Sequence, residues 1–471
     1  MTTPPLALHP DRLFPADPGV RRLASSLYAG VKDLPIISPH GHVPAQWLAD
    51  DVSFADPTSL LITPDHYVTR LLHAHGVDLS DLGVGRGSFD EADSRRAFRI
   101  LCEHWSVYRG TPVRFWLDAQ LGDIFGIDVR PGGATADAIY DQIAERLSRP
   151  DYRARALFDR FGIEVLATTD DPCDDLAAHR RLADDPSWDA RVVPTFRPDR
   201  YLEPLSPTWN ADVDRLAETS GIETGAYEGW LAAMAARRAH FIAHGAVSAD
   251  HSHLDVRTDR LTDAEAQHLY ALARKGDIGT GEAVALRRHL LHQMGLMSAE
   301  DGLVMTVHPA VRRDHHLPSS EAYGHDIGTD IPVAVEFTDA LRPLLNAVGT
   351  HPGFQLVLFT LDETTFSREI APLAGFYPSV YAGAPWWFLD APEAIQRYRS
   401  AVTETAGLTK TSGFIDDTRA FCSIPARHDM SRRLDAAYVA RLVVEHRLDE
   451  DEAREAIHDL VDTNPRRAFK L

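Results

Sequence analysis

The sequence predicts an α/β fold, specifically a distorted (β/α)8 barrel of the TIM type with a large helical insertion after the first strand. Eight short apolar runs read as buried parallel strands, helical stretches separate them, and nearly every run ends in ionisable or aromatic residues. In such barrels the active site is built at the carboxyl ends of the strands. The eight predicted strands are 34–38, 163–168, 192–196, 246–249, 303–308, 355–360, 380–384 and 412–415.

The first two predicted strands are separated by more than a hundred residues. An unstructured loop of that length is implausible, and helical patterns occur at 63–75, 93–108, 114–125 and 135–149. We therefore predict four parts. They are an N-terminal segment with the first strand (1–50), a helical insertion capping the barrel mouth (51–160), the remainder of the barrel (161–430) and C-terminal helices packed on the barrel (431–471).

The composition narrows the class of protein. The net charge of −21 over 471 residues argues against nucleic-acid or anionic-membrane partners, which require a concentrated positive surface. Three cysteines are too few for a disulfide framework. The sequence has no signal-peptide pattern and no apolar stretch as long as a membrane span. We expect a cytoplasmic protein, and a homo-oligomer fits a barrel of this size.

The motif His40-Gly41-His42 directly follows the first predicted strand. Residues spaced two apart on an extended segment point the same way. Two such imidazoles hold a divalent cation when a third ligand comes from elsewhere in the chain. The alternative is a polar turn that happens to contain two histidines.

A set of motifs in fixed order resembles the uronate isomerase (glucuronate isomerase) family of the amidohydrolase superfamily, almost from end to end. The resemblance implies interconversion of D-glucuronate with D-fructuronate and of D-galacturonate with D-tagaturonate. The motifs are 40–42, 64–70, 168–172, 195–199, 250–251, 308–313, 385–388, 416–419 and 427–428.

Carried over to this chain, the resemblance implies one divalent metal ion, with zinc as the expected ion, held by His40, His42 and Asp417. The family motif at the last strand is an aspartate, a small hydroxyl residue and an arginine, which matches Asp417-Thr418-Arg419 and leaves Asp416 outside it. Asp417 and Arg419 also share one face of an extended segment.

The implied reaction moves a proton between C2 and C1 through an enediolate, so it needs a base, an acid and positive charge near the two oxygens. Tyr67 and Asp417 are the candidate proton carriers. An unperturbed phenol has a pKa of about 10, and a guanidinium beside it favours the phenolate. Arg419 or Arg70 is expected to supply that charge. His66 stands beside Tyr67 in the same motif, and the predicted catalytic residues are Tyr67, Asp417, Arg419 and His66.

The carboxylate of a hexuronate requires an arginine. Arg197 follows the third predicted strand and suits bidentate recognition. Arg313 is the second choice, although the adjacent Arg312 leaves the register open. Trp386 is expected to stack on the sugar. His251 has two alternatives, a structural histidine and a ligand of a second metal. The predicted substrate-binding residues are Arg197, Arg313, Arg70, Trp386 and His251.

Two other functions stay open from the sequence alone. A single-metal hydrolase of the same superfamily, acting on a sugar-acid lactone, ester or amide, would use a metal-bound hydroxide. The fourth predicted strand does not end in the lysine that two-metal hydrolases of that superfamily often use. A non-catalytic sugar-acid binding protein would keep Arg197 and is expected to lose Tyr67 or Asp417. The sequence assigns no residue that distinguishes glucuronate from galacturonate.

Overall fold

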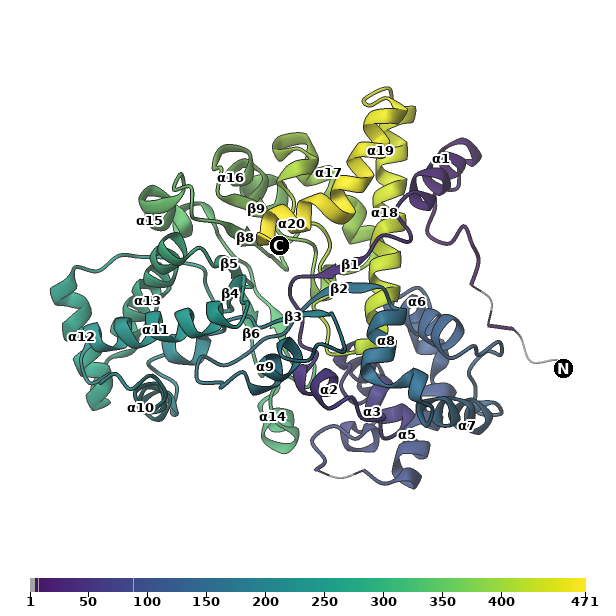
Figure 1. Cartoon of the computed structure of the whole chain (residues 1–471), viewed down its shortest axis with the longest axis horizontal. Helices are drawn as coiled ribbons and strands as arrows, with labels where there is room; N and C mark the ends of the chain where they lie inside the picture. Colours follow the sequence, from purple (N-terminus) through teal and green to yellow (C-terminus); the bar gives the residue numbers. More distant parts are fainter. Residues whose placement is uncertain (1–4, 7, 88) are drawn as a thin grey trace.

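The computed structural model describes residues 5–6, 8–87 and 89–471 and has a mixed α/β fold with parallel sheets. One sheet has the order β1 (Ile36–Ser38), β2 (Ile163–Ala167), β3 (Arg191–Val193). The other has the order β4 (Ser248–His251), β5 (Val304–Val307), β8 (Leu356–Leu358), β9 (Val380–Ala382). These seven strands confirm seven of the eight predicted strands, and Figure 1 shows them in the middle of the molecule.

Single parallel bridges continue the order of the strands beyond the two sheets. Phe196, just after β3, bridges both Asp170 and Ala249, so the residues after β3 lie beside β4. At the far side Ala382 of β9 bridges Thr411. Because neighbouring strands are parallel and follow chain order, their carboxyl ends meet at one edge. The residues that follow each strand therefore gather there.

The eighth predicted strand, 412–415, was wrong, because Ser412 to Ile415 form no strand. Gly413 has φ +72°, a left-handed conformation that an extended strand does not contain. A Cβ at Gly413 would lie 2.6 Å from Cδ of Pro465. The C-terminal segment comes close to the backbone at Gly413, where the chain turns. Of the predicted eighth strand, the described residues keep only the single bridge between Thr411 and Ala382.

A small antiparallel hairpin was not predicted. It pairs β6 (Val311–Arg312) with β7 (Ile331–Pro332). Between these strands runs a loop that contains α14 (Leu317–Tyr323). The hairpin fixes both ends of this 313–330 loop directly after β5, beside the edge where the strand ends meet.

The interval between β1 and β2 is helical, and its helices confirm the four predicted helical stretches. The helix α4 begins at its N-cap Asp65, whose side chain accepts a hydrogen bond from the amide of Tyr67. The α-helices of the interval are α2 (Ala45–Asp50), α3 (Pro57–Leu61), α4 (His66–His73), α5 (Glu91–Glu103), α6 (Pro112–Ala119), α7 (Ala136–Leu147) and α8 (Ala154–Arg160).

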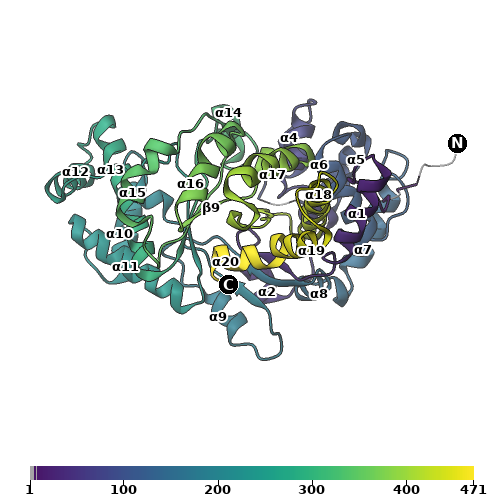
Figure 2. The ribbon, with the colours of Figure 1, turned by 90° about the horizontal axis from the view of Figure 1, so that it is seen from above.

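The remaining helices surround the strands. Figures 1 and 2 both place α10–α13 at one end of the molecule and α1 with the helices of the β1–β2 interval at the other. They are α1 (Pro18–Ala29), α9 (Ala177–Ala183), α10 (Trp209–Ser220), α11 (Tyr227–Ala243), α12 (Asp263–Lys275), α13 (Thr280–Asp301), α15 (Thr338–Val348), α16 (Ala371–Phe376), α17 (Pro392–Ala406), α18 (Ile424–Val444), α19 (Glu450–His458) and α20 (Asn464–Phe469).

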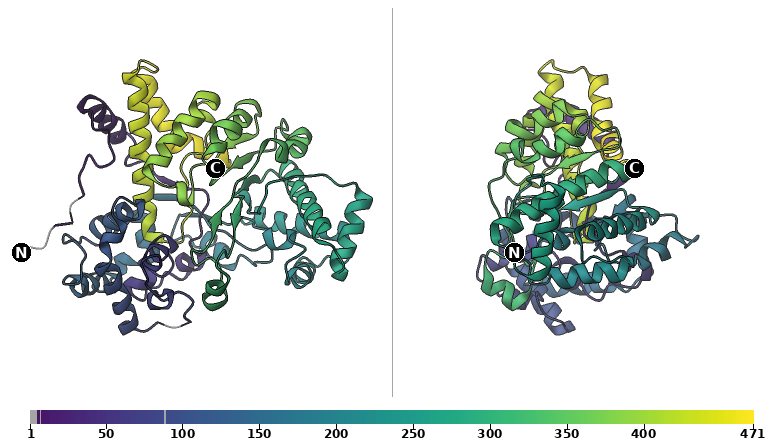
Figure 3. Two further views of the ribbon diagram at one scale, coloured as in Figure 1. Left: turned by 180° about the vertical axis from the view of Figure 1, so that it is seen from behind. Right: turned by 90° about the vertical axis from the view of Figure 1, so that its left-hand side faces the viewer.

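The long helix α18 ties the chain ends to the strand region. It packs against α1, α17 and α19, and most of its residues are buried. Figure 3 shows it from behind as a rod that runs from the α1 side toward the helices of the β1–β2 interval. Among the described residues no helix combines the length and the apolar character needed to cross a bilayer.

Candidate active site

A cavity of about 660 Å³ lies at the carboxyl ends of the strands. Its walls come from the segments after β1 to β5, from the start of α4, from the 313–330 loop and from the segments around 386 and 417. The structure brings together nine of the residues predicted for the site: His40, His42, His66, Tyr67, Arg197, Arg313, Trp386, Asp417 and Arg419.

Two imidazoles and a carboxylate, those of His40, His308 and Asp417, lie close enough together to form a donor set for a metal ion, and a third imidazole, His42, lies beside Asp417. The Nε2 atoms of His40 and His42 lie 3.4 and 3.0 Å from Oδ1 of Asp417. His308, which follows β5, has a ligand atom within 4.8 Å of those of His40 and Asp417. Burial would raise the pKa of Asp417, but the adjacent imidazoles of His40 and His42 hold it well below its usual range.

The tautomer of His308 is set by a buried carboxylate. Its Nδ1 lies 2.6 Å from Oδ1 of Asp250, so Nδ1 carries the proton and Nε2 has a free lone pair. That Nε2 is buried and has no hydrogen-bond partner among the described residues. Burial also lowers the pKa of His308. A neutral imidazole with a free, buried nitrogen fits a divalent metal ion such as zinc.

Tyr67 lies on the cavity wall under a buried guanidinium. The guanidinium carbon of Arg427, from α18, is 4.6 Å from the ring centroid of Tyr67 and 3.7 Å from that of Trp116. Arg427 is fully buried and donates to Oδ2 of Asp390 at 2.8 Å. Burial raises the pKa of Tyr67, and the charge of Arg427 opposes this rise more than any other group does.

His66 is packed between rings beside the phenol. Its imidazole stacks on Tyr67 with centroids 4.9 Å apart and lies 5.3 Å from the ring of Trp387. Burial, with a further contribution from the charge of Arg419, lowers the pKa of His66 to about 3. His66 is therefore neutral at physiological pH.

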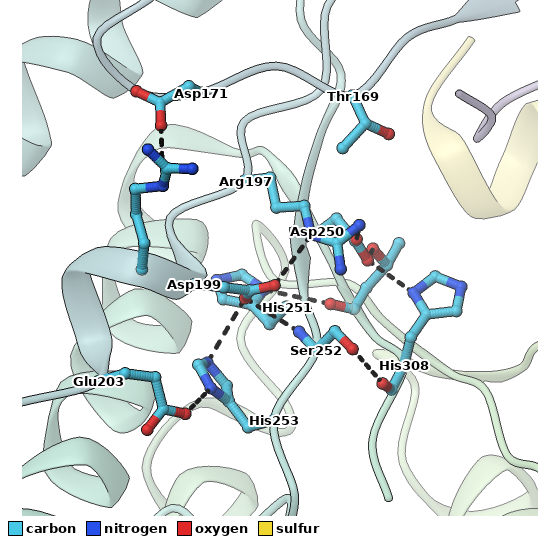
Figure 4. Close-up of polar contacts among 12 residues, drawn as sticks. Thr169, Asp171, Arg197, Asp199, Glu203, Asp250, His251, Ser252, His253 and His308 are labelled. Atoms are coloured by element: carbon cyan, nitrogen blue, oxygen red, sulfur yellow. Dashed lines mark hydrogen bonds and ion pairs between the residues drawn. The ribbon is translucent and has the colours of Figure 1, made fainter. Parts of the chain in front are cut away.

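The predicted carboxylate-binding arginines face the cavity in pairs with acids. Arg197 donates from Nε to Asp199 at 2.9 Å and lies 3.6 Å from Asp250. Figure 4 shows Arg197 between these two acids, with His308 on the far side of Asp250. Arg313, and not Arg312, lines the cavity. The ring of Trp386 meets that of His308 edge-on at 4.7 Å.

Two predicted substrate-binding residues do not line the cavity. Arg70 sits farther along α4, with its guanidinium 4.6 Å from the ring centroid of Phe388. His251 is buried and its Nδ1 lies 3.1 Å from the carbonyl oxygen of Thr306 on the neighbouring strand. Its other ring nitrogen, Nε2, has no partner among the described residues.

Sequence reasoning did not assign four residues that complete this arrangement, namely His308, Asp250, Arg427 and Asp326. The first two had a usable signal, because each stands at the end of a predicted strand. Arg427 stands in the 427–428 motif that carries the family resemblance, but no role was assigned to it, and Asp326 had no signal because it comes from a loop that the sequence does not place.

Comparisons with known proteins indicate one family over nearly the whole chain. A sequence model described as glucuronate isomerase matches residues 20–469. A uronate isomerase of Cutibacterium acnes is 56% identical, with 100% of each chain covered. The crystal structure of a glucuronate isomerase from Caulobacter crescentus is 45% identical with a TM-score of 0.97, covering 99% of this chain and 97% of that one.

A more distant solved structure has the same overall shape. The uronate isomerase from Thermotoga maritima is 27% identical with a TM-score of 0.92, covering 98% of this chain and 99% of that chain. The family model extends from helix α1 to helix α20, and the similarity to relatives spans the strand ends that line the cavity. This chain belongs to the glucuronate isomerase family.

Proposed function

We propose that this protein is an aldose–ketose isomerase that interconverts D-glucuronate with D-fructuronate and D-galacturonate with D-tagaturonate. The observation that carries the proposal is one cavity containing the donor set, Tyr67 and several arginines. Full-length relatives named uronate isomerase support it.

The metal site has a defined donor set in this proposal. His40, His42, His308 and Asp417 would hold one divalent ion, and zinc is the ion we propose because imidazole nitrogens predominate. When bound, the ion supplies a positive charge that orients and polarises substrate oxygens. Asp250 fixes the tautomer of His308 through its hydrogen bond at 2.6 Å.

The proton transfer uses residues of the chain itself. Tyr67 moves a proton at its phenol oxygen, and Asp417 is the second carrier. Arg427 lies over the ring of Tyr67 and stabilises the negative charge that the phenolate spreads over that ring. Arg419, predicted from the sequence as a catalytic residue, is assigned here to the substrate carboxylate instead, because it lines the cavity and shares Asp326 with Arg313. The buried, neutral His66 supports the phenol by stacking on it.

The substrate is held through its carboxylate and through the apolar side of the sugar. We propose Arg197, Arg313 and Arg419 as the groups that attract the carboxylate, since their guanidinium groups face the cavity. Trp386 and Trp387 cover the apolar side of the sugar. Arg70 and His251 do not contact the substrate in this proposal. Arg70 supports the cavity wall by packing on Phe388, and His251 supports it through its hydrogen bond to the carbonyl of Thr306 on β5.

We also propose that the parallel strands form one distorted (β/α)8 barrel, with residues 51–160 as the cap of its mouth. The bridges of Phe196 and Ala382 support this, as does a hydrogen bond from the amide of His42 to the carbonyl of Thr418 at 3.0 Å. The parts 1–50, 161–430 and 431–471 are the first strand, the rest of the barrel and the C-terminal helices. A cytoplasmic homo-oligomer is the proposed form in the cell.

A substrate panel tests the activity. Purified protein, with and without a chelator, is mixed with D-glucuronate, D-galacturonate and a sugar-acid lactone. We expect ketose from one or both uronates and no hydrolysis of the lactone. Lactone opening without ketose formation would favour the hydrolase alternative, and activity that survives complete metal removal would contradict the proposed role of the ion.

A further inference from the structure

Every guanidinium group that lines the cavity in the described part of the chain already has a carboxylate partner. An incoming anionic substrate therefore competes with acids of the protein itself. The pairs are Arg197 with Asp199 and Asp250, Arg200 with Asp171 and Asp212, Arg313 with Asp326 and Asp330, and Arg419 with Asp326.

Asp326 differs from the other acids in two ways. Its two oxygens bind two cavity arginines at once, Arg419 from Nη2 at 2.9 Å and Arg313 from Nη1 at 3.2 Å. Its side chain is 43% exposed, whereas those of the other paired acids are at most 24% exposed. Asp330, the second partner of Arg313, is 1% exposed. Asp326 is thus the acid that is easiest to displace.

Asp326 belongs to the 313–330 loop, whose ends the β6–β7 hairpin fixes. The loop reaches α4, because a Cβ on Gly328 would lie 3.1 Å from Cβ of Arg70. Burial would raise the pKa of Asp326, but Arg419 and Arg313 lower it to about 2. Its carboxylate is ionised at neutral pH and is a chemical equivalent of a substrate carboxylate.

We propose that Asp326 is a specificity-determining residue that occupies Arg313 and Arg419 until the carboxylate of the substrate displaces it. The inference rests on the proposed function, because it names those two arginines as the substrate-carboxylate site. A uronate exchanges one carboxylate for another, so the two guanidinium groups stay compensated. A neutral hexose cannot make that exchange, since a hydroxyl would leave Arg419 without its anion and Arg313 with Asp330 alone.

The same exchange predicts how anions of different charge bind. A dianionic sugar acid brings a second carboxylate into a cavity where Arg197 keeps its own buried acid, Asp250. While Asp326 stays nearby, the dianion meets like-charge repulsion. Removing the charge of Asp326 should therefore help anions bind, and help the dianion most.

Two ligands that cannot isomerise test this. L-gulonate is D-glucuronate with its aldehyde reduced to an alcohol, and D-glucarate is the same compound with the aldehyde oxidised to a second carboxylate. Calorimetry measures their binding to the wild type, to Asp326→Asn and to the control Asp314→Asn. Asp314 lines the same cavity but pairs with His325. Steady-state kinetics with D-glucuronate give KM and kcat for each protein.

We expect Asp326→Asn to bind L-gulonate about fivefold more tightly, D-glucarate more tightly still, and to lower KM. The Asp314→Asn control should match the wild type. A gain of affinity is not what a merely structural role produces. Unchanged or weaker binding of both ligands by a folded Asp326→Asn protein would overturn the inference. If that protein misfolds, Asp326→Ser is measured in the same way.

The two proposals fail separately. If the wild type converts no uronate but the affinity gain is seen, the proposed function fails and the competition by Asp326 stands. If the wild type isomerises uronates but Asp326→Asn shows no gain, only the inference about Asp326 is wrong.

Discussion

Arg427 is the residue whose charge most affects Tyr67, and it is fully buried with Asp390 as its partner. Replacement of Arg427 by Met removes a positive charge from the face of the phenol, so the pKa of Tyr67 rises. Because burial already raises the pKa of Tyr67, the accessible pH range lies on the acid limb, and kcat at a fixed pH near neutrality should fall by about tenfold for each pKa unit.

Arg427→Lys is the matched variant, because it keeps a cation at the same position. We expect its kcat near neutrality to stay close to that of the wild type. If Arg427→Lys lowers kcat as much as Arg427→Met does, Arg427 serves packing against Trp116 and not the charge of the phenol.

Asp250 acts on the metal site through His308. Replacement by Asn weakens the hydrogen bond that fixes the tautomer, and loss of such a partner typically costs about 10–100-fold in metal affinity. The metal content after dialysis against graded chelator concentrations measures this directly. Asp199→Asn is the control, since Asp199 contacts Arg197 and the amide of Ser252, away from His308. Equal metal retention by both variants would contradict the assigned role.

The identities of the strand-end residues were predictable because strand ends in a parallel sheet converge. That rule brings His40, His42 and Arg197 to one cavity, and the family resemblance selected Asp417 over the adjacent Asp416. The rule gives no information on Arg427, which enters from α18, because a helix periodicity indicates which face is buried and not which neighbour it meets.

At the scale of single elements, the 313–330 loop is held against α4 at Gly328. Both Gly328 and Gly324 have φ +92°, a backbone conformation that alanine rarely adopts. Alanine at either position should therefore lower the free energy of unfolding by about 1–3 kcal/mol. Only at Gly328 would the new Cβ press on Arg70 and His66; at Gly324 nothing lies within 4 Å.

Gly328→Ala should therefore lower kcat/KM, because it pushes the helix that carries His66 and Tyr67. Gly324→Ala should lose similar stability in chemical denaturation and keep kcat/KM near the wild-type value. If both variants lose catalytic efficiency to the same extent, the contact with α4 has no functional role and strain alone explains the loss.

The elements themselves were mostly predictable. Seven strands and four of the helical stretches between β1 and β2 follow from apolar runs and helical periodicity. The run 412–415 was misread because its apolar residues surround Gly413, whose positive φ depends on the distant Pro465. The β6–β7 hairpin has only two residues per strand, too short for an alternating pattern to indicate it.

At the scale of the whole molecule, α18 joins the strand region to both chain ends, and a buried ion pair fixes it to α17. Arg399 binds Asp435 at 2.6 and 2.8 Å, and the two side chains are 3% and 2% exposed. Arg399→Met leaves a buried carboxylate without its partner and should lower the free energy of unfolding by about 3–5 kcal/mol.

Urea denaturation measures this loss. The double variant Arg399→Met with Asp435→Leu removes both charges and should recover much of the stability, because no unpaired charge stays buried. If the double variant is as unstable as the single one, the ion pair matters through its shape and not through its charge.

The donor set for the metal ion draws on His40, His308 and Asp417, which span most of the chain. A polypeptide still being synthesised holds the first imidazoles long before the carboxylate has emerged from the ribosome. In the proposed site, all three donors can hold one ion only after translation has passed residue 417, so the complete site forms on the nearly finished chain rather than on a short nascent one.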